Sequence, residues 1–417
     1  MYLRGSKFNM TRRRRNSSPL VILLLLILIA GVVYINLVVV PATPPLFIPT
    51  STPTTSPATF IKNAQDLVSQ GKIQQGMAAY QEAIRSDPKN AANYITLAQL
   101  QVFTGDYQGA VDNAQNALLL NATNSMANAV YGWALGYKGN FLEADAAIQK
   151  AIEYDPNNGI AFAYEADVLS LQYQTGTDIL GVVQKATDAS REAQRLAPNA
   201  LETHRARGIV LEITQNYEEA VNEFEAAINI NPNIADLHLA LGRNLRALNQ
   251  YAKAVEEFNR ANALNPADPL PNTYIARTYL TIGDFPKAIQ YAQQAVKVSP
   301  SDPYMYGNLG TMYYRNRQYR ESLDPFRLAL YGGTTADGIQ VEGLPMDNDR
   351  VVEYYYLFGL AAARINQCSD ALKISQYLQE NAAENETAVY NAKEMVNICQ
   401  QWITGTPTPT RENAPSS

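Results

Sequence analysis

Proline recurs at a fixed 34-residue spacing along this 417-residue chain. Pro232, Pro266 and Pro300 follow one another at that interval, and Pro88 lies two intervals before Pro156. A period of this length is typical of stacked copies of one small structural unit. Each unit of such an array is buried against its neighbours only, so the array can grow beyond the size of one globular core.

Small residues keep step with the prolines. If the closing proline of each unit is position 32, then positions 20 and 27 are small, as in the pair Ala220 and Ala227. Position 8 is glycine or alanine in nine units: Ala64, Ala98, Gly132, Ala166, Gly208, Gly242, Ala276, Gly310 and Gly359. Small side chains at these positions let two helices approach closely. The pattern therefore predicts paired helices.

This pattern resembles the tetratricopeptide repeat family, whose 34-residue helix-turn-helix unit has small residues at positions 8, 20 and 27 and proline at position 32. The resemblance covers roughly residues 57 to 402 and is clearest from Leu201 to Asp302. It implies an all-α fold, a right-handed superhelical solenoid of about nine helix-turn-helix units over residues 58–403. One membrane-spanning helix is expected to precede it.

The chain also departs from the family pattern. Position 4 is aromatic at Phe60, Tyr94, Phe162 and Tyr306 but becomes Asn128, His204, His238 and Asn272 elsewhere. We expect different packing at those joints between units. Two stretches exceed the period, and insertions are predicted near residues 174–181, as a protruding loop, and near residues 332–349, as an irregular loop between the eighth and ninth units.

Residues 20–40 carry no charge and are nearly all Leu, Ile and Val. As a helix they would extend about 30 Å, which is enough to span a bilayer. Six basic residues lie before this stretch, and no Lys or Arg follows it until Lys62. The asymmetry predicts residues 1–19 in the cytoplasm and the array outside, at the cell membrane. The length of the apolar run and its end at Val38, Val39, Val40 and Pro41, without a small-x-small cleavage site, favour an uncleaved signal anchor.

The segments that flank the array cannot build a core. Residues 41–57 are rich in Pro, Thr and Ser, which favours an extended spacer between membrane and array, although a ligand for a proline-binding domain is the alternative. Residues 404–417 are predicted to be a disordered tail.

The net charge of the chain is −6, and its first twenty residues hold six basic and no acidic groups. The rest of the chain therefore carries −12, which disfavours binding to nucleic acid.

Only two cysteines occur in the chain. Cys368 opens the second helix of the ninth unit, and Cys399 lies near the end of the next helix, which should run antiparallel to it. A disulfide that fixes the terminal helix fits an oxidising compartment. Two buried free thiols are the alternative.

In the family the first helix of each unit lines the concave face, with positions 2, 5, 9, 12 and 13 turned toward it. The resemblance therefore indicates two groups of candidate partner-binding residues. An apolar strip contains Phe103, Trp133 and Tyr137, and a later group contains Arg205, Arg243, Arg246, Arg277, Tyr304, Tyr314 and Arg315. The arginines would bind carboxylates or phosphates. The alternatives are packing between units for the strip, and ion pairs with Glu202, Glu212 and Asp236 for the arginines.

No catalytic motif is evident. His204 and His238 are the only histidines and occupy position 4 of adjacent units, too far apart to share a zinc ion. Neither a Cys-x-x-Cys pair nor a phosphate-binding glycine loop occurs. We expect no enzymatic activity, no cofactor, no metal and no small-molecule substrate.

The sequence thus predicts a membrane-anchored scaffold that binds a protein or peptide partner on the concave face of an extracytoplasmic array. A transmembrane sensor or regulatory subunit, which binds a ligand outside and signals through its short cytoplasmic end, is the alternative.

Overall fold

The computed structural model describes residues 18–39, 56–176 and 181–405, which form two separate units divided after Thr55. Three predicted segments lie wholly or largely outside these residues: the basic segment 1–19, the spacer 41–57 and the tail 404–417. Part of the first insertion, residues 177–180, also lies outside them.

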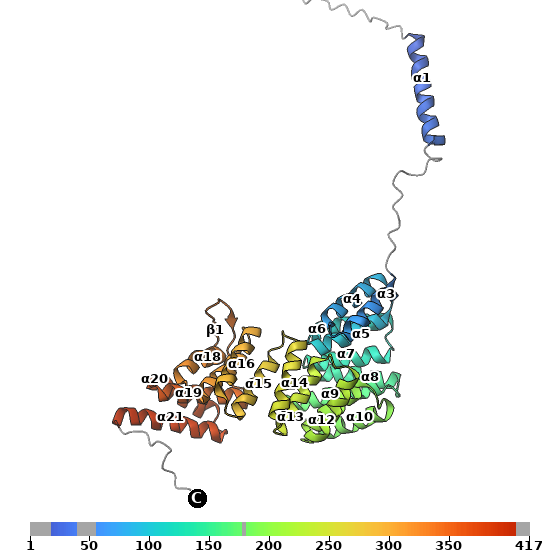
Figure 1. The fold of residues 1–417 in the computed structure, drawn as a ribbon. Helices are drawn as coiled ribbons and strands as arrows, with labels where there is room; N and C mark the ends of the chain where they lie inside the picture. The colour runs from blue at the N-terminus through green and yellow to red at the C-terminus, as the bar shows by residue number, and fades with distance from the viewer. Residues whose placement is uncertain (1–17, 40–55, 177–180, 406–417) are drawn as a thin grey trace, which may run out of the picture. The chain divides into compact units, whose positions relative to one another are not determined.

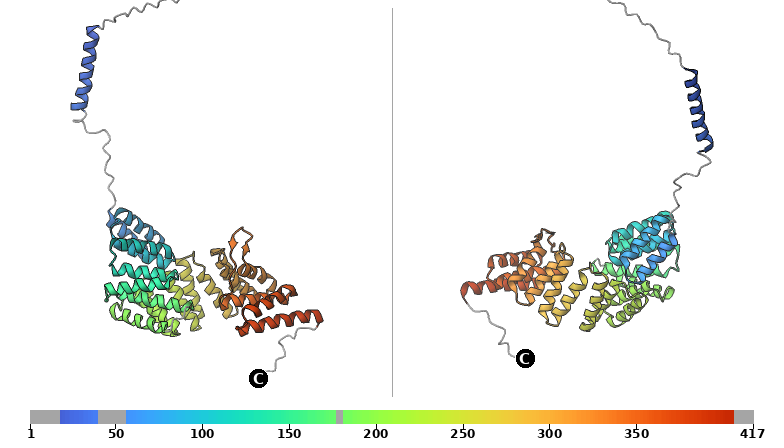
Figure 2. Two further views of the ribbon diagram at one scale, coloured as in Figure 1. Left: turned by 180° about the vertical axis from the view of Figure 1, so that it is seen from behind. Right: turned by 45° about the horizontal axis from the view of Figure 1, so that its top comes forward.

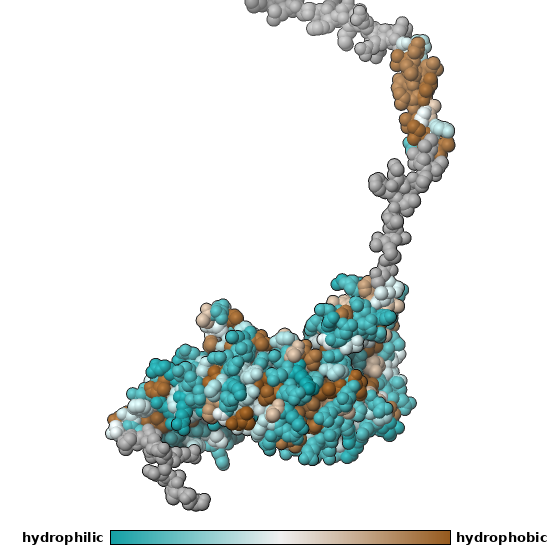
Figure 3. Space-filling view, in the orientation of Figure 1, coloured by the Kyte–Doolittle hydropathy of each residue, from teal (hydrophilic) through white to brown (hydrophobic). Residues whose placement is uncertain are grey.

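The first unit contains one helix, α1 (Pro19–Tyr34), which continues into a π-helical turn at Ile35–Val39. Residues Pro19–Val38 have a mean hydropathy of 3.0, and none of them is buried against the rest of the chain. Figure 3 shows the corresponding hydrophobic surface. By length and composition this helix fits a membrane span or a signal sequence.

The second unit is an all-α solenoid, as predicted, built within its described residues from nine helical hairpins and a terminal helix (Figure 1). The hairpins are α3 (Pro57–Ser69) with α4 (Ile73–Ser86), α5 (Ala91–Thr104) with α6 (Tyr107–Leu120), α7 (Ser125–Tyr137) with α8 (Phe141–Tyr154), α9 (Gly159–Gln174) with α10 (Val182–Leu196), α11 (Leu201–Ile213) with α12 (Tyr217–Ile230), α13 (Ala235–Ala247) with α14 (Tyr251–Leu264), α15 (Leu270–Thr281) with α16 (Phe285–Val298), α17 (Pro303–Arg315) with α18 (Tyr319–Tyr331), and α19 (Asp349–Arg364) with α20 (Cys368–Asn381). The terminal helix is α21 (Glu386–Thr404).

Local sequence signals begin and end these helices. Side chains such as Asn124 and Asp302 accept hydrogen bonds from backbone N–H groups of the first turn that have no helical partner. The turn inside most hairpins contains one left-handed residue, for example Gly283 or Arg317. Glycine adopts this conformation without strain, whereas arginine does so at a cost.

The small residues at position 8 allow the two helices of a hairpin to touch. A Cβ atom at Gly242 would lie 2.5 Å from the ring of Phe258 in the second helix of the same unit. Phe258 itself is completely buried. Glycine here is therefore required by the packing of the aromatic residue that faces it.

In several units the residue at position 4 links successive units through a polar contact that the aromatic pattern does not reveal, whereas His204 and Asn272 instead contact Glu223 and Asn262. Tyr306 donates a hydrogen bond of 2.9 Å to the carbonyl of Pro300, six residues earlier. His238 makes the same contact to Pro232 at 2.8 Å, and Asn128 makes it to Ala122 at 3.1 Å. The departures at position 4 in these units thus keep one interaction and change only the donor.

The second insertion forms a short antiparallel hairpin of β1 (Gly333–Thr334) and β2 (Gln340–Val341), in which Gly333 pairs with Val341. Val341 is buried against Tyr306 and Ala329. The insertion is therefore packed onto α17 and α18.

The array closes on itself between its first and sixth hairpins. Asn233, just before α13, donates a 2.9 Å hydrogen bond to the carbonyl of Ser69 at the end of α3, across 164 residues of sequence. Phe103 of α5 packs against the hydrophobic core of α11 to α14. We call residues 57–247 the closed turn and residues 270–404 the C-terminal arm; Figure 2 gives two further views of these hairpins.

Candidate partner-binding surface

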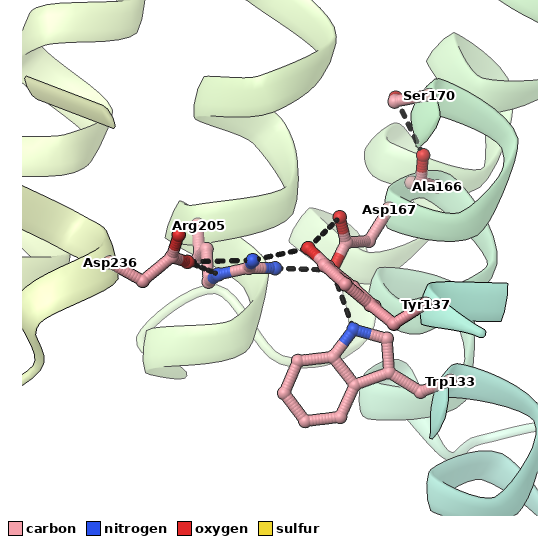
Figure 4. A network of polar contacts seen from close by, with 7 residues as sticks. All are labelled: Trp133, Tyr137, Ala166, Asp167, Ser170, Arg205 and Asp236. Carbon is pink, nitrogen blue, oxygen red and sulfur yellow. Dashed lines mark hydrogen bonds and ion pairs between the residues drawn. The ribbon is translucent and has the colours of Figure 1, made fainter. Parts of the chain in front are cut away.

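Arg205 lies at the centre of the closed turn and is only 5% exposed (Figure 4). Its guanidinium contacts the carboxylate of Asp167 on α9 and that of Asp236 on α13, the latter at 2.8 Å. It also donates to the hydroxyl of Tyr137 on α7 at 2.6 Å. One side chain of α11 therefore links three other hairpins.

Aromatic residues complete this network. Trp133 is fully buried, donates from Nε1 to Asp167 at 2.6 Å, and stacks on Tyr164 with ring centroids 4.3 Å apart. The guanidinium of Arg205 lies 5.6 Å from the Trp133 ring and 5.8 Å from Phe103. The predicted apolar strip and Arg205 thus contact one another inside the closed turn, as in the packing alternative.

Two carboxylates surround the guanidinium of Arg205 in this interior. Burial lowers the pKa of Arg205, but Asp167, Tyr137 and Asp236 outweigh burial and raise that pKa well above its ordinary value. For Tyr137, burial raises the pKa of the hydroxyl, which therefore stays protonated. A buried and fully paired cation of this kind leaves no free charge for a ligand.

The next two predicted arginines are also directed into the array. Arg243 forms a two-bond pair with Glu212, at 2.8 and 2.9 Å, as the ion-pair alternative anticipated. The Nε atom of Arg246 is buried and has no hydrogen-bond partner among the described residues.

The C-terminal arm differs because two of its predicted residues, Arg277 and Arg315, line an open hollow, whereas Tyr304 and Tyr314 do not. A cavity of about 400 Å³ lies between α15, α17 and α19, and its charged lining residues are Arg277, Arg315, Arg350 and Glu353. Arg277 donates to Asn308 at 3.0 Å, whereas Arg315 reaches Glu353 only at 3.6 Å and is half exposed. Three guanidinium groups thus face one carboxylate.

A second hollow of about 430 Å³ adjoins the first and shares Arg350 and Glu353 with it. Of the two tyrosines predicted for this surface, Tyr304 accepts a hydrogen bond from Asn348, and Tyr314 packs edge to face on Tyr319. Sequence reasoning missed Arg350, because it lies in the first turn of α19, directly after an insertion that interrupts the repeat register.

Cys368 and Cys399 are joined by a disulfide with their Cα atoms 5.6 Å apart, which ties α21 to α20.

The two histidines contact different glutamates and not each other. His204 contacts Glu223 at 2.7 Å, and His238 contacts Glu257 at 2.6 Å. Among the described residues no group of three or more His, Cys, Asp or Glu side chains is placed to hold a metal ion.

Comparisons with known proteins agree with this architecture. Three family models, each described as tetratricopeptide repeat, match residues 61–129 and 275–337, residues 214–277, and residues 127–158. The chain belongs to the tetratricopeptide repeat family, whose members serve as scaffolds for protein–protein interaction and are generally not catalysts.

Two solved structures are similar to the chain. A tetratricopeptide repeat protein from Parabacteroides merdae ATCC 43184 has 15% identity and a TM-score of 0.39, and the match covers 61% of this chain and 98% of that one. The human IFIT1 dimer with PPP-AAAA has 17% identity and a TM-score of 0.49, over 79% of this chain and 73% of that one. Neither likeness bears on function. No curated protein matches the chain.

Proposed function

We propose that this protein is a non-enzymatic, membrane-anchored scaffold that holds acidic segments of partner proteins on the concave side of its C-terminal arm. The observation that carries the proposal is the cavity between α15, α17 and α19, where Arg277, Arg315 and Arg350 face the single carboxylate of Glu353. Guanidinium groups bind carboxylates through two parallel hydrogen bonds, which favours an acidic peptide over a neutral one.

Apolar residues beside the arginines fit a peptide better than a free anion. Leu280, Phe285 and Met312 line the same cavity. A segment that combines Asp or Glu with aliphatic side chains would bury its apolar groups there while its carboxylates meet the arginines.

The anchor and its orientation belong to the same proposal. Residues Pro19–Val38 are long and apolar enough to cross a membrane; six basic residues precede them, and no Lys or Arg follows them until Lys62. A single span with the N-terminus in the cytoplasm would present the array outside. Partners held close to the membrane would then meet at raised effective concentration.

Binding of a synthetic peptide tests the groove. We would measure fluorescence anisotropy of a ten-residue peptide of alternating Glu and Leu against the full chain in detergent micelles. The triple variant Arg277→Ala, Arg315→Ala, Arg350→Ala is expected to weaken binding at least tenfold, because it removes all three cations of the cavity. The counterpart peptide with Gln in place of Glu is expected to bind weakly to both proteins.

The matched control is the triple variant Arg85→Ala, Arg260→Ala, Arg327→Ala. These arginines are at least half exposed and pair with acidic residues on their own helices. This variant changes the net charge equally and should bind the peptide as the parent does. Equal weakening by the two triple variants would show that net charge rather than the groove attracts the peptide, and the proposal would fail.

A further inference from the structure

A cavity of about 1100 Å³ lies away from the concave face, between α8, α9 and α10. It is lined from α9 by Phe162, Glu165 and Leu169. Successive residues of a helix are rotated by about 100°, so these three side chains lie on the opposite side of α9 from Asp167, which points into the network of Figure 4. This outer cavity is therefore a separate site from the closed interior and from the arm.

The floor of the outer cavity is apolar. Ile148 and Val168 are buried there, Phe162 and Leu169 are partly exposed, and Leu142 at the rim is 80% exposed. The volume exceeds the roughly 300–1,000 Å³ of small-molecule pockets. A hollow of this size, lined along α8, α9 and α10, can take a short segment of polypeptide.

Acidic side chains surround this floor. Glu143, Asp145 and Glu165 line the cavity, and none of the three forms an ion pair within the part of the chain that the structure describes. Lys185 is the one basic residue among the lining residues. Two further carboxylates, Asp188 and Glu192, belong to exposed pairs with arginines three residues away on α10.

Glu165 is the least solvated of these carboxylates. Burial raises its pKa, and a 2.8 Å hydrogen bond donated by Gln149 opposes that effect only in part. Asp145 raises the pKa further, because two negative charges repel each other, and Lys185 lowers it in turn, but the net effect is a raised pKa. An incoming ammonium or guanidinium group would therefore relieve an unfavourable charge at this position.

We propose that the outer cavity binds a cationic amphipathic helix of a partner protein. Its apolar side chains, spaced three or four residues apart, would enter the floor between α8 and α10. Lysine or arginine residues on both sides of that apolar face would then meet Glu143, Asp145 and Glu165. An apolar floor with an acidic rim is the complement of such a helix.

The probe is a fluorescein-labelled peptide of fourteen Leu and Lys residues arranged to form an amphipathic helix. Two comparison peptides have Glu in place of every Lys, or the same Leu and Lys residues in an order that forms no apolar face. Each peptide is titrated into the full chain in uncharged detergent micelles, with micelles alone as the blank, and anisotropy is recorded. We expect micromolar binding of the amphipathic Leu/Lys peptide and at least tenfold weaker binding of the other two.

The variant Glu143→Gln, Asp145→Asn, Glu165→Gln is expected to weaken binding of the Leu/Lys peptide at least tenfold. The matched control Glu218→Gln, Glu225→Gln, Glu321→Gln alters three exposed glutamates outside the cavity and should change it less than twofold. Leu142→Asn, at a highly exposed position, should weaken binding several-fold while the helical circular-dichroism signal and the melting curve remain those of the parent.

The proposal is overturned if the two triple variants lose affinity equally, if the reordered peptide binds as well as the amphipathic one, or if the parent shows no binding above the micelle blank. The variant Arg277→Ala, Arg315→Ala, Arg350→Ala serves as a further check. It should leave binding of the Leu/Lys peptide unchanged, so the outer cavity can be tested whether or not the arm binds acidic peptides.

Discussion

The closed turn and the C-terminal arm both contain arginines of the predicted partner-binding group and use them differently. Arg205 in the closed turn is buried between Asp167 and Asp236. Arg315 in the arm is half exposed and reaches one carboxylate at 3.6 Å. The difference arises because Asn233 and Ser69 bring the first and sixth hairpins together. Arg243 and Arg277, which are 34 residues apart and share one position of the repeat, differ in the same way, since Arg243 pairs with Glu212 and Arg277 lines the cavity of the arm.

The largest expected effect comes from removing Asp167. Asp167→Ala leaves Arg205 buried without its main partner, and loss of one member of a buried pair costs about 3–5 kcal/mol. Glu353→Ala, which removes the partner of Arg315 in the arm, should cost less than about 1 kcal/mol. Urea unfolding followed by circular dichroism measures both, and similar losses in the two variants would remove the distinction between the regions.

Loss of the disulfide should affect only the arm. Cys368→Ser frees α21 from α20, and a bridge across 31 residues of sequence typically contributes about 2–4 kcal/mol. Hydrogen exchange followed by mass spectrometry should show faster exchange in α20 and α21 and unchanged exchange in the closed turn. Reductant should reproduce this pattern in the parent and leave the variant unaffected. Faster exchange throughout the array would contradict the division into a closed turn and a C-terminal arm.

Packing at position 8 should be sensitive within the closed turn. Gly242→Leu places atoms where the Phe258 ring lies, and overpacking of this kind costs about 1–3 kcal/mol. Ala247→Leu on the same helix is the control, because Ala247 is exposed and a surface change is expected to cost no more than about 0.5 kcal/mol. Thermal melting distinguishes them. If Gly242→Leu melts like the parent, the assigned register is wrong.

The smallest effect should come from the hairpin turns of the arm. Arg317 has a φ of 61°, which is strained for any residue with a Cβ atom, so Arg317→Gly should raise the free energy of unfolding by up to about 1 kcal/mol. Part of this gain is offset by the greater freedom of glycine in the unfolded chain. The reverse change at the equivalent position, Gly283→Ala, should lower stability. Chemical denaturation measures both variants. If their free energies of unfolding do not change in opposite directions, strain in the turns does not contribute to stability.

Sequence periodicity predicted the fold because the small residues pack against residues of their own hairpin. Gly242 and Phe258 are sixteen residues apart, within one repeat, and that spacing is readable from the chain. Whether a residue of the concave face is buried or available to a partner depends on contacts between residues far apart in sequence. Arg205 and Asp167, for example, are separated by 38 residues. No pattern within one unit encodes such contacts. Arg350 was missed for a related reason, since the preceding insertion removes the register that would have placed it.

The polar joint at position 4 explains how an array of this kind tolerates sequence drift. Tyr306, His238 and Asn128 have little in common except a donor that reaches a carbonyl six residues back. Interchange among these three residue types would therefore preserve the stacking of one hairpin on the next. A repeat protein built this way can exchange the side chain at this position and keep the backbone contact between neighbouring hairpins.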